Sequence, residues 1–424
     1  MTTISLARPN WWVRFTQALE RSTILWGQPR HVMILSLILY TGISCTAGAP
    51  WRLSHQPYYN YLADAFLHGQ LNLRQISGST IDLSLFHGKY FMYWGPLPAL
   101  FAMLPVVLFG VQVSDVLQLL VLSALTVGAL AAALQAANRR GVIHLSPAQL
   151  GLLVLFFALG SAYFPITETG HVWQTVTVAS LLFVFLAFLA AFTQEGGRAF
   201  LLTGCGLAGV LLTRQSAIFV GIFLAWYLLD RYWQVGWRRL LGYAALAGLP
   251  VLAALALTGV YNWARFGSPL DNGIAYHLMS DYFRGDYQQY GYMNVHFIPG
   301  NFYYTYIFYP FSFIPLNTFN RCGSMFLLSP LFFMGLYALW QNRKEAKTWV
   351  LFASIVLGTI PLLLLMGPGS GLFGPRYTLD FVMPMLLLTA LGMQRLPNRW
   401  TGLLVAISVV QYLVGGLIYV HVVP

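Results

Sequence analysis

Residues 113–140 read VSDVLQLLVLSALTVGALAAALQAANRR, an apolar run that ends in a pair of arginines. A helix needs about 20 such residues to cross the hydrocarbon core of a bilayer, and this run is long enough. Basic residues at the end of a span mark its cytoplasmic side. The stretch therefore predicts a transmembrane helix and also its orientation, with Arg139 and Arg140 inside.

The composition of the whole chain agrees with this reading. Of 424 residues, 58% are hydrophobic and 8% are charged, whereas a soluble globular protein carries about 25% charged residues. So few charges cannot cover the surface of a soluble domain, and so much hydrophobicity excludes disorder. The net charge of +11 does not indicate nucleic acid, because the longest basic segment is the short 343–347. The three cysteines are too far apart for a metal site or a disulfide framework.

Further apolar runs predict the other spans. They lie at 32–48, 95–111, 148–165, 170–193, 199–213, 215–230, 240–263, 323–341, 348–366, 377–393 and 400–421. The basic loops between them can all be cytoplasmic only if one early run fails to span. The run 95–111 is the candidate, because it opens with Gly95-Pro96-Leu97-Pro98 and carries Pro105, which suits a re-entrant or interfacial segment. We predict an all-α polytopic membrane protein with about eleven transmembrane helices and juxtamembrane helices on its outer face.

Residues 1–31 mix aromatic and basic side chains and do not match a signal peptide, so we expect a cytoplasmic amphipathic segment in the membrane interface. Residues 32–424 form a single transmembrane domain. With the amino terminus inside, the long polar segments 49–112, 264–322 and 367–376 are outer loops. They hold most of the remaining ionisable groups, and we therefore expect the chemistry on the outer face.

The first outer loop offers two candidate residues. Tyr58, Tyr61 and Leu62 recur at helical spacing and predict an amphipathic helix along the membrane, on which Asp64 shares a face with the histidine four residues later. Asp64 is either a base or metal ligand, or a solvated acid paired with that histidine. Lys89 stands in an aromatic-rich strip and is either a substrate contact or an anchor at the interface.

The later outer segments add four candidates. Glu168 and His171 lie at the mouth of two spans, where ionisable groups are functional hypotheses and also common structural pairs. Arg214 interrupts an apolar stretch, which costs roughly 2.5–3.5 kcal/mol on insertion scales unless the charge is paired. A guanidinium fork suits phosphate. Arg376 stands four residues before Asp380, so it forms either an intrahelical ion pair or an anion site. The tyrosines of 287–309 line either a sugar groove or a head-group belt.

The order of these pieces resembles the C-type (GT-C) integral membrane glycosyltransferases, which include protein mannosyltransferases and bacterial aminoarabinose transferases. The resemblance rests on the Tyr58-Tyr59 pair in a long first outer loop, Lys89-Tyr90-Phe91 ahead of Gly95-Pro96-Leu97-Pro98-Ala99, His171, the segment GLAGVLLTR at 206–214, and Arg265-Phe266-Gly267-Ser268-Pro269. Such enzymes take a sugar from a polyprenyl-phosphate carrier and use an acid of the first outer loop as base. Where several relatives carry that acid, this chain reads His55-Gln56. The resemblance thus implies Asp64, or His55, as the catalytic base.

The resemblance implies a multi-pass glycosyltransferase of the inner (plasma) membrane, with the stereochemical course left open. Its substrate-binding residues would be Tyr58, Tyr59, Lys89, Glu168, His171, Arg214, Arg376 and Tyr377. Its partners would be a polyprenyl-phosphate sugar donor, membrane lipid, and a saccharide, lipid or protein acceptor, with no nucleic acid. No cofactor is required; a divalent metal is permitted, although no ligand cluster is evident. The alternative is a non-enzymatic lipid-linked-saccharide binder, transporter or flippase, which would need the arginines but no base.

Overall fold

A computed structural model describes residues 22–422 except positions 49, 77, 312–320, 368, 370 and 371. Most of the predicted interfacial segment 1–31 therefore lies outside the described residues. The α-helices are α2 (Pro29–Ala47), α3 (Tyr58–Leu67), α4 (Leu97–Phe109), α5 (Asp115–Arg139), α6 (Pro147–Leu159), α7 (Val172–Thr193), α8 (Gly196–Leu211), α9 (Gly221–Tyr232), α10 (Trp237–Phe266), α11 (Asp281–Tyr290), α12 (Ile298–Phe302), α13 (Met325–Leu328), α14 (Phe333–Gln341), α15 (Ala346–Leu364), α16 (Val382–Met393) and α17 (Asn398–Val422).

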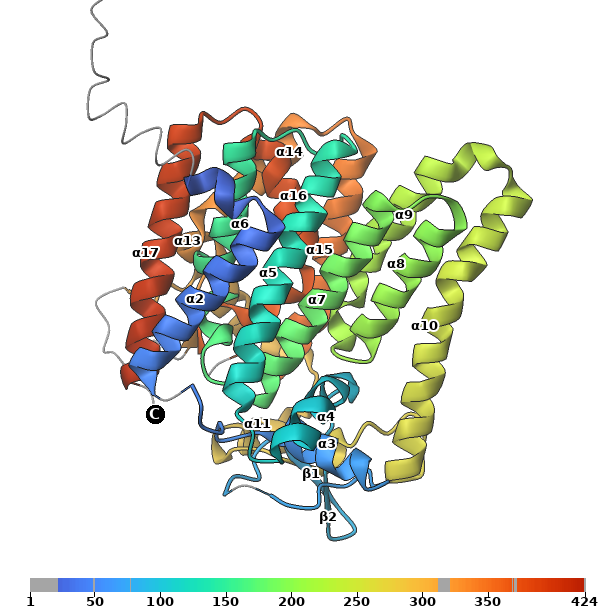
Figure 1. Ribbon diagram of the computed structural model, residues 1–424, viewed down its shortest axis with the longest axis vertical. Coiled ribbons are helices and arrows are strands. Elements are labelled where there is room, and N and C mark those ends of the chain that lie inside the picture. Colours follow the sequence, from blue (N-terminus) through green and yellow to red (C-terminus); the bar gives the residue numbers. More distant parts are fainter. Residues whose placement is uncertain are drawn as a thin grey trace, which may run out of the picture.

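Long helices stand side by side in one bundle (Figure 1). By length and composition, α5, α7, α10, α15 and residues 398–418 of α17 are able to cross a membrane. Shorter apolar helices, such as α6 and α8, stand between them. Every predicted span coincides with a helix or with consecutive short helices of this bundle. The predicted all-α architecture is confirmed, and the chain is a multi-pass membrane protein.

Helix starts in the bundle follow from the sequence. The Ser114 hydroxyl caps α5 by accepting a hydrogen bond from the backbone nitrogen of Leu117. Ser146 and Gln149 form a reciprocal capping box at the start of α6, where Pro147 occupies a position that needs no N–H. Since unpaired backbone groups are costly in hydrocarbon, these caps stabilise the starts of α5 and α6.

The segments that the sequence predicts as outer loops gather at one end of the bundle, which we call the loop-bearing end (Figure 1). It carries α3, α4, α11 and the strands β1 (Leu83–Phe86), β2 (Lys89–Phe91) and β3 (His277–Leu278). The connections α5–α6, α9–α10 and α14–α15, which hold the predicted cytoplasmic charges, lie at the opposite end. The structure thus separates the two groups of loops as predicted, while the side that faces the cytoplasm stays a prediction.

Helix α4 packs on α3 at the loop-bearing end and does not run through the bundle (Figure 1). It has 13 residues, too few for a spanning helix, and its outer face exposes Leu104, Leu108 and Phe109. This arrangement agrees with the expectation that 95–111 is interfacial or re-entrant.

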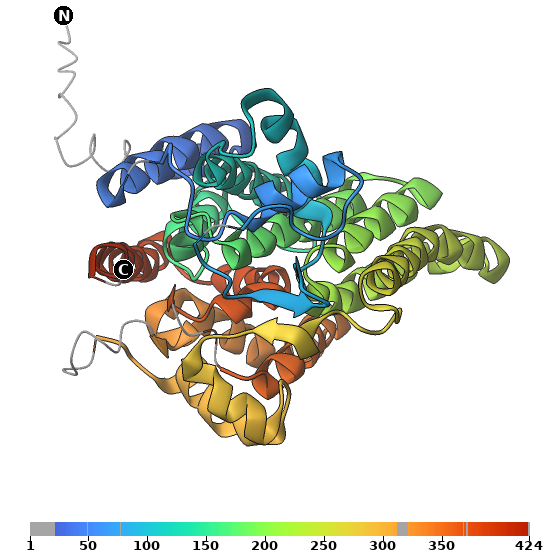
Figure 2. The ribbon, with the colours of Figure 1, turned by 90° about the horizontal axis from the view of Figure 1, so that it is seen from below.

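A small antiparallel sheet joins the two longest outer loops. Strand β1 pairs with β2 in a hairpin and with β3, so Ser84 lies opposite His277. Figure 2, which looks onto the loop-bearing end, shows the first outer segment in blue meeting the second in yellow. This pairing brings residues near position 82 beside residues near position 277.

Candidate functional site

Arg214 and Asp380 form a buried ion pair near the loop-bearing end. Arg214 lies in the break between α8 and the 3-10 helix η2 (Gln215–Val220), and its Nε donates a hydrogen bond to Oδ1 of Asp380 at 2.5 Å. The Ser216 hydroxyl donates to the other carboxylate oxygen at 2.5 Å. Only 9% and 2% of the two charged side chains are exposed. The pair offsets the desolvation of Arg214, and the two terminal amino groups remain for a ligand.

Arg376 could form either an intrahelical ion pair with Asp380 or an anion site. The pairing of Asp380 with Arg214 decides between these two alternatives. Arg376 and Asp380 belong to the 3-10 helix η9 (Arg376–Phe381). With about three residues per turn, positions four apart do not share a face, so the intrahelical pair does not form. Within the described residues Arg376 makes no ion pair, and its buried Nε has no hydrogen-bond partner.

A row of rings and guanidinium groups, which we call the ring stack, leads from the first outer loop to the ion pair. The ring centres of His55 and His171 lie 6.4 Å apart. Those of His171 and Trp173 lie 5.2 Å apart, and the angle between these two ring planes is 7°. Arg376 lies 4.4 Å from the centre of the Trp173 ring. Arg214 and Arg376 both contact the ring of Tyr377, at 5.1 and 5.2 Å. The ring stack is therefore His55, His171, Trp173, Arg376, Tyr377 and Arg214.

His171 is a neutral member of the ring stack. Burial lowers its pKa to about 4, and the neighbouring His55 and Arg376 act in the same direction. Asp380 offsets one of the two arginine charges of the ring stack, so a positive charge remains there. An excess of positive charge beside a partly buried cavity favours an anionic ligand.

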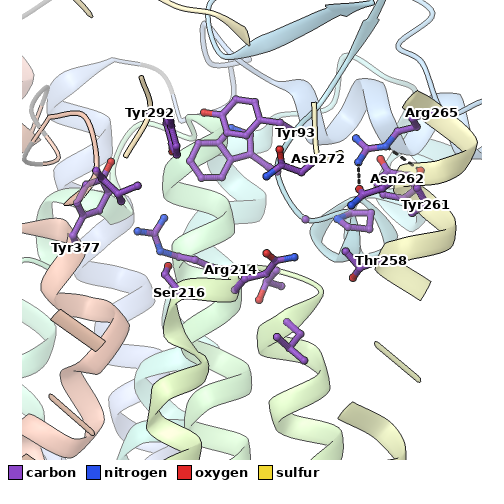
Figure 3. A pocket seen from close by; sticks show the side chains of 17 residues that line it. Tyr93, Arg214, Ser216, Thr258, Tyr261, Asn262, Arg265, Asn272, Tyr292 and Tyr377 are labelled. Carbon is purple, nitrogen blue, oxygen red and sulfur yellow. Dashed lines mark hydrogen bonds between the residues drawn. The ribbon is translucent and has the colours of Figure 1, made fainter. Parts of the chain in front are cut away.

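A cavity of about 230 Å³ lies against Arg214. Figure 3 shows the Arg214 side chain pointing toward the space bounded by Tyr377, Tyr292 and Tyr93, with Ser216 beneath it. The far wall comes from the end of α10, where Arg265 donates to Asn262 at 2.8 Å and to the carbonyl oxygen of Met92. We call this space the arginine cavity; it combines Arg214 at one edge and Arg265 on the far wall with aromatic and amide side chains.

Two donors on the wall of the arginine cavity are unused. The Trp94 indole nitrogen and the Tyr261 hydroxyl are buried and have no hydrogen-bond partner in the part of the chain that the structure describes. A buried donor without a partner costs about 1–3 kcal/mol. Both groups are therefore suited to bind a polar ligand.

The predicted residues of the first outer loop separate into two groups. Tyr58 and Tyr59 are buried and hold the loop, since Tyr58 donates to the carbonyl oxygen of Ile81 at 2.7 Å and Tyr59 to that of Gly95 at 3.2 Å. Asp64 lies elsewhere on α3, where both of its carboxylate oxygens accept hydrogen bonds from Arg74 at 3.1 Å. Its predicted pairing with the histidine four residues later is also present, at 3.4 Å. Asp64 lines neither the arginine cavity nor the ring stack.

Lys89 and Glu168 also lie outside the arginine cavity. Lys89 is exposed on β2 at the hairpin. Glu168 is buried beneath the loop-bearing end beside Gly416 of α17, and burial raises its pKa to about 8. Within the described residues neither of its carboxylate oxygens has a hydrogen-bond partner. The structure thus brings His55, His171, Arg214, Arg376 and Tyr377 together and leaves Asp64, Lys89 and Glu168 apart.

Asp82 and His277 are residues that the sequence analysis did not select. The Nε2 of His277 lies 3.2 Å from Oδ1 of Asp82, and Tyr93 packs edge-on against the imidazole at 4.8 Å. Burial raises the pKa of Tyr93, and the charge of Asp82 raises it further, so this carboxylate lies close to the arginine cavity. Asp82 has a φ of 68°, which is uncommon for a residue other than glycine. No local pattern links two residues that meet only through the β1–β3 pairing.

A metal site is not evident in the described residues. No group of three or more His, Cys, Asp or Glu side chains there is arranged to hold an ion. Asp82, for example, is paired with His277.

Comparison with known proteins connects this architecture to a fold. No family model matches the chain, and no curated protein matches its sequence significantly. The apo oligosaccharyltransferase of Archaeoglobus fulgidus matches 93% of this chain and 56% of its own length, with 12% identity and a TM-score of 0.51. ArnT from Cupriavidus metallidurans, solved with undecaprenyl phosphate, matches 92% of this chain and 76% of its own length, with 13% identity and a TM-score of 0.48.

The chain therefore has the fold of the GT-C membrane glycosyltransferases. The oligosaccharyltransferase shows this fold, and this chain covers just over half of its length. The expected fold is confirmed. The activity must be argued from the site itself, because one fold can host several functions.

Proposed function

We propose that this protein is a membrane glycosyltransferase that moves a sugar from a polyprenyl-phosphate donor to an acceptor at the loop-bearing end. The observation that carries the proposal is the Arg214–Asp380 pair at the edge of the arginine cavity, with Arg376 on the same tyrosine ring. Only Arg214 of these two guanidinium groups pairs with a carboxylate in the described residues, so the site keeps a positive charge for a phosphate. The shared GT-C fold supports the same function.

The arginines would act on the leaving group. When the bond between the anomeric carbon and the phosphate oxygen breaks, the electron pair stays with the phosphate. Arg214 and Arg376 bind that oxygen anion more strongly as its charge grows, which lowers the barrier. Trp94 and Tyr261 line the same cavity and carry unpaired donors that would bind the sugar hydroxyls.

His55 is the better placed of the two proposed bases. The acceptor hydroxyl must lose its proton as its oxygen attacks the anomeric carbon, and a base within hydrogen-bond reach takes that proton. His55 belongs to the ring stack that ends at the arginines, whereas Asp64 pairs with Arg74 outside the ring stack. An imidazole accepts a proton near neutral pH. Glu168 and His171 would act by shaping the loop that holds this ring, and the role of Asp64 stays a prediction.

The test uses purified protein in lipid vesicles with a radiolabelled polyprenyl-phosphate sugar and membrane acceptors. We expect His55→Gln to lose transfer by at least about 100-fold, which is the usual contribution of a general base, while the carrier still binds. Asp64→Asn should keep most of the transfer. Asp281→Asn, in the exposed pair with Arg284 on α11, is the matched control for loss of an arginine-paired carboxylate at the same end.

Three results would change the proposal. Full transfer by His55→Gln together with loss in Asp64→Asn would assign the base to Asp64. Carrier binding without transfer in the wild type would favour the binder or transporter, for which the arginines suffice and no base is needed. Absence of both binding and transfer in the wild type would remove the phosphate site altogether.

Orientation and location belong to the same proposal. We place the loop-bearing end outside the cell, in the inner (plasma) membrane, with the amino terminus in the cytoplasm. Arg140 and Arg231 at the opposite end both pair with Glu195, and this cluster keeps a net positive charge. Excess positive charge on short loops supports a cytoplasmic location for that end.

A further inference from the structure

A second cavity lies on the other side of the 93–98 segment. It has a volume of about 420 Å³ and is bounded by α3, α4, α5 and α7. Its walls are mostly apolar and include Phe101 and Phe109 of α4 and Val121 and Leu125 of α5. We call it the α4–α5 groove. Pro96 belongs to the wall of the arginine cavity and Pro98 to that of the groove, so the two spaces are neighbours.

The groove opens on the apolar surface of the bundle. Phe101, Phe109, Val121 and Leu125 line it and are also at least two-fifths exposed. Exposed apolar side chains on a membrane protein face lipid chains. A hydrocarbon chain can therefore enter the groove sideways from the bilayer.

The polar end of the groove lies beside the proposed base. Gln56 and Gly170 belong to the wall and are the sequence neighbours of His55 and His171. The Gln56 amide oxygen is buried and has no hydrogen-bond partner among the described residues. An amide oxygen accepts a hydrogen bond from a hydroxyl group.

Charge distinguishes this groove from the arginine cavity. Its described lining contains no Lys or Arg and includes Asp115, whose carboxylate accepts hydrogen bonds from the backbone and hydroxyl of Ser54 at 2.8 and 2.5 Å. A phosphate at this end would meet a carboxylate without a cation to offset it. The groove therefore suits an amphiphile with an uncharged hydroxyl head group rather than the phosphate carrier.

We infer that the α4–α5 groove binds the hydrocarbon chain of a lipid acceptor and presents its hydroxyl to His55. The inference rests on the proposed function and names its acceptor class. The structure then assigns separate entrances to the two substrates: the phosphate carrier in the arginine cavity, and a hydroxyl-headed lipid in the groove.

The test labels the groove with a diacylglycerol that carries a diazirine in its acyl chain, using full-length protein in vesicles. Peptide mapping should find the label on α4 and α5 at the groove. Val121→Trp fills the rim and should lower both the labelling and the rate with the lipid acceptor by about fivefold, the effect of losing roughly 1 kcal/mol of binding. Leu108→Trp is the matched control, because Leu108 is exposed on α4 and does not line the groove.

A second variant tests the head group. Gln56→Met removes the unpaired amide oxygen and should raise the KM for the lipid acceptor by about fivefold, as the loss of one hydrogen bond predicts. Polyprenyl-phosphate binding should not change in either groove variant. Thermal unfolding of each variant separates a local effect from misfolding.

Several results would overturn the inference. Equal labelling of wild type and Val121→Trp would show non-specific contact with lipid. Labelling of the groove by a diazirine-bearing polyprenyl phosphate would assign it to the donor. Transfer to a peptide or soluble sugar that Val121→Trp leaves unchanged would exclude a lipid acceptor. If the wild type transfers no sugar at all, the proposed function fails, while the labelling experiment still decides whether the groove binds a lipid chain.

Discussion

The Nε of Arg214 lies 2.5 Å from a carboxylate oxygen of Asp380, although 166 residues separate them in the chain. Arg214 follows α8 and Asp380 precedes α16, so the ion pair fixes two parts of the bundle relative to each other. Ser216 holds the other carboxylate oxygen and thereby sets the orientation of the pair. This contact places the guanidinium at the edge of the arginine cavity (Figure 3).

Removing the negative partner should destabilise the protein. Asp380→Asn leaves Arg214 buried without a counter-charge, and such a change typically costs about 3–5 kcal/mol. The double variant Arg214→Met/Asp380→Leu buries no charge and should recover most of that loss, although it would not bind the carrier. Denaturation of the protein in detergent measures both. If Asp380→Asn is as stable as the wild type, the pair is not structurally important.

Arg376 should contribute more to carrier binding than Trp173, whose ring it contacts. Arg376→Ala removes a charged donor, worth about 1.5–3 kcal/mol, and should weaken binding of a fluorescent polyprenyl phosphate by more than tenfold. Trp173→Leu removes only the ring contact, worth about 0.5–1 kcal/mol, and should weaken it a few-fold. Equal binding by Arg376→Ala and the wild type would leave Arg376 with a purely structural role.

A methyl group at Gly95 should disturb the arginine cavity. A Cβ there would lie 2.4 Å from the carbonyl oxygens of Leu212 and Thr213, immediately before Arg214. Because backbone must move to make room, we expect Gly95→Ala to cost about 1–3 kcal/mol and to weaken carrier binding. Gly42→Ala is the control, since a Cβ in α2 would meet nothing within 4 Å. Its better helix propensity should make it neutral or more stable by up to about 1 kcal/mol.

Glu168 should make stability depend on pH. Burial raises its pKa from 4.5 to about 8, so between these values the folded protein holds a proton that the unfolded chain releases. The contribution of Glu168 to stability should therefore be largest below pH 4.5 and fall as pH rises toward 8, by up to about 1.4 kcal/mol per pH unit. We expect Glu168→Gln to lose this slope.

Unfolding midpoints at pH 5.5 and pH 8 measure the effect of Glu168. Asp286→Asn in α11 is the control, because it changes an exposed acid at the same end. The wild type should lose stability between the two values, and Glu168→Gln should not. A parallel fall in both proteins would show that another group is responsible.

The spans could be predicted because each depends on local sequence. Residues 113–140 predict a helix, and α5 occupies Asp115–Arg139. The prolines at 96, 98 and 105 predict that the next run toward the amino terminus does not cross, and α4 lies at the loop-bearing end. Apolar length, helix-breaking residues and loop charge act within a few turns of the chain, so a single sequence displays them.

Part of the site could also be anticipated. A lone arginine in an apolar stretch needs a partner, and Arg214 has one. The sequence suggested an ion pair between Arg376 and Asp380, because the two residues are four positions apart. The 3-10 geometry of η9 prevents that pair, and Asp380 instead pairs with Arg214, which lies in the break between α8 and η2. Whether a segment forms an α-helix or a 3-10 helix depends on its tertiary packing, and the spacing of residues in the sequence does not reveal this.

Sequence alone determined that this chain is a helical membrane protein, where its helices run and which segments share an end. Tertiary structure decided which side chains meet: it joined Arg214 to Asp380, stacked His55 on His171, paired Asp82 with His277, and left Asp64 with Arg74. The physical reason is distance along the chain. Hydrophobic burial and loop charge act on each segment separately, whereas an ion pair or a cavity exists only after distant helices have packed together.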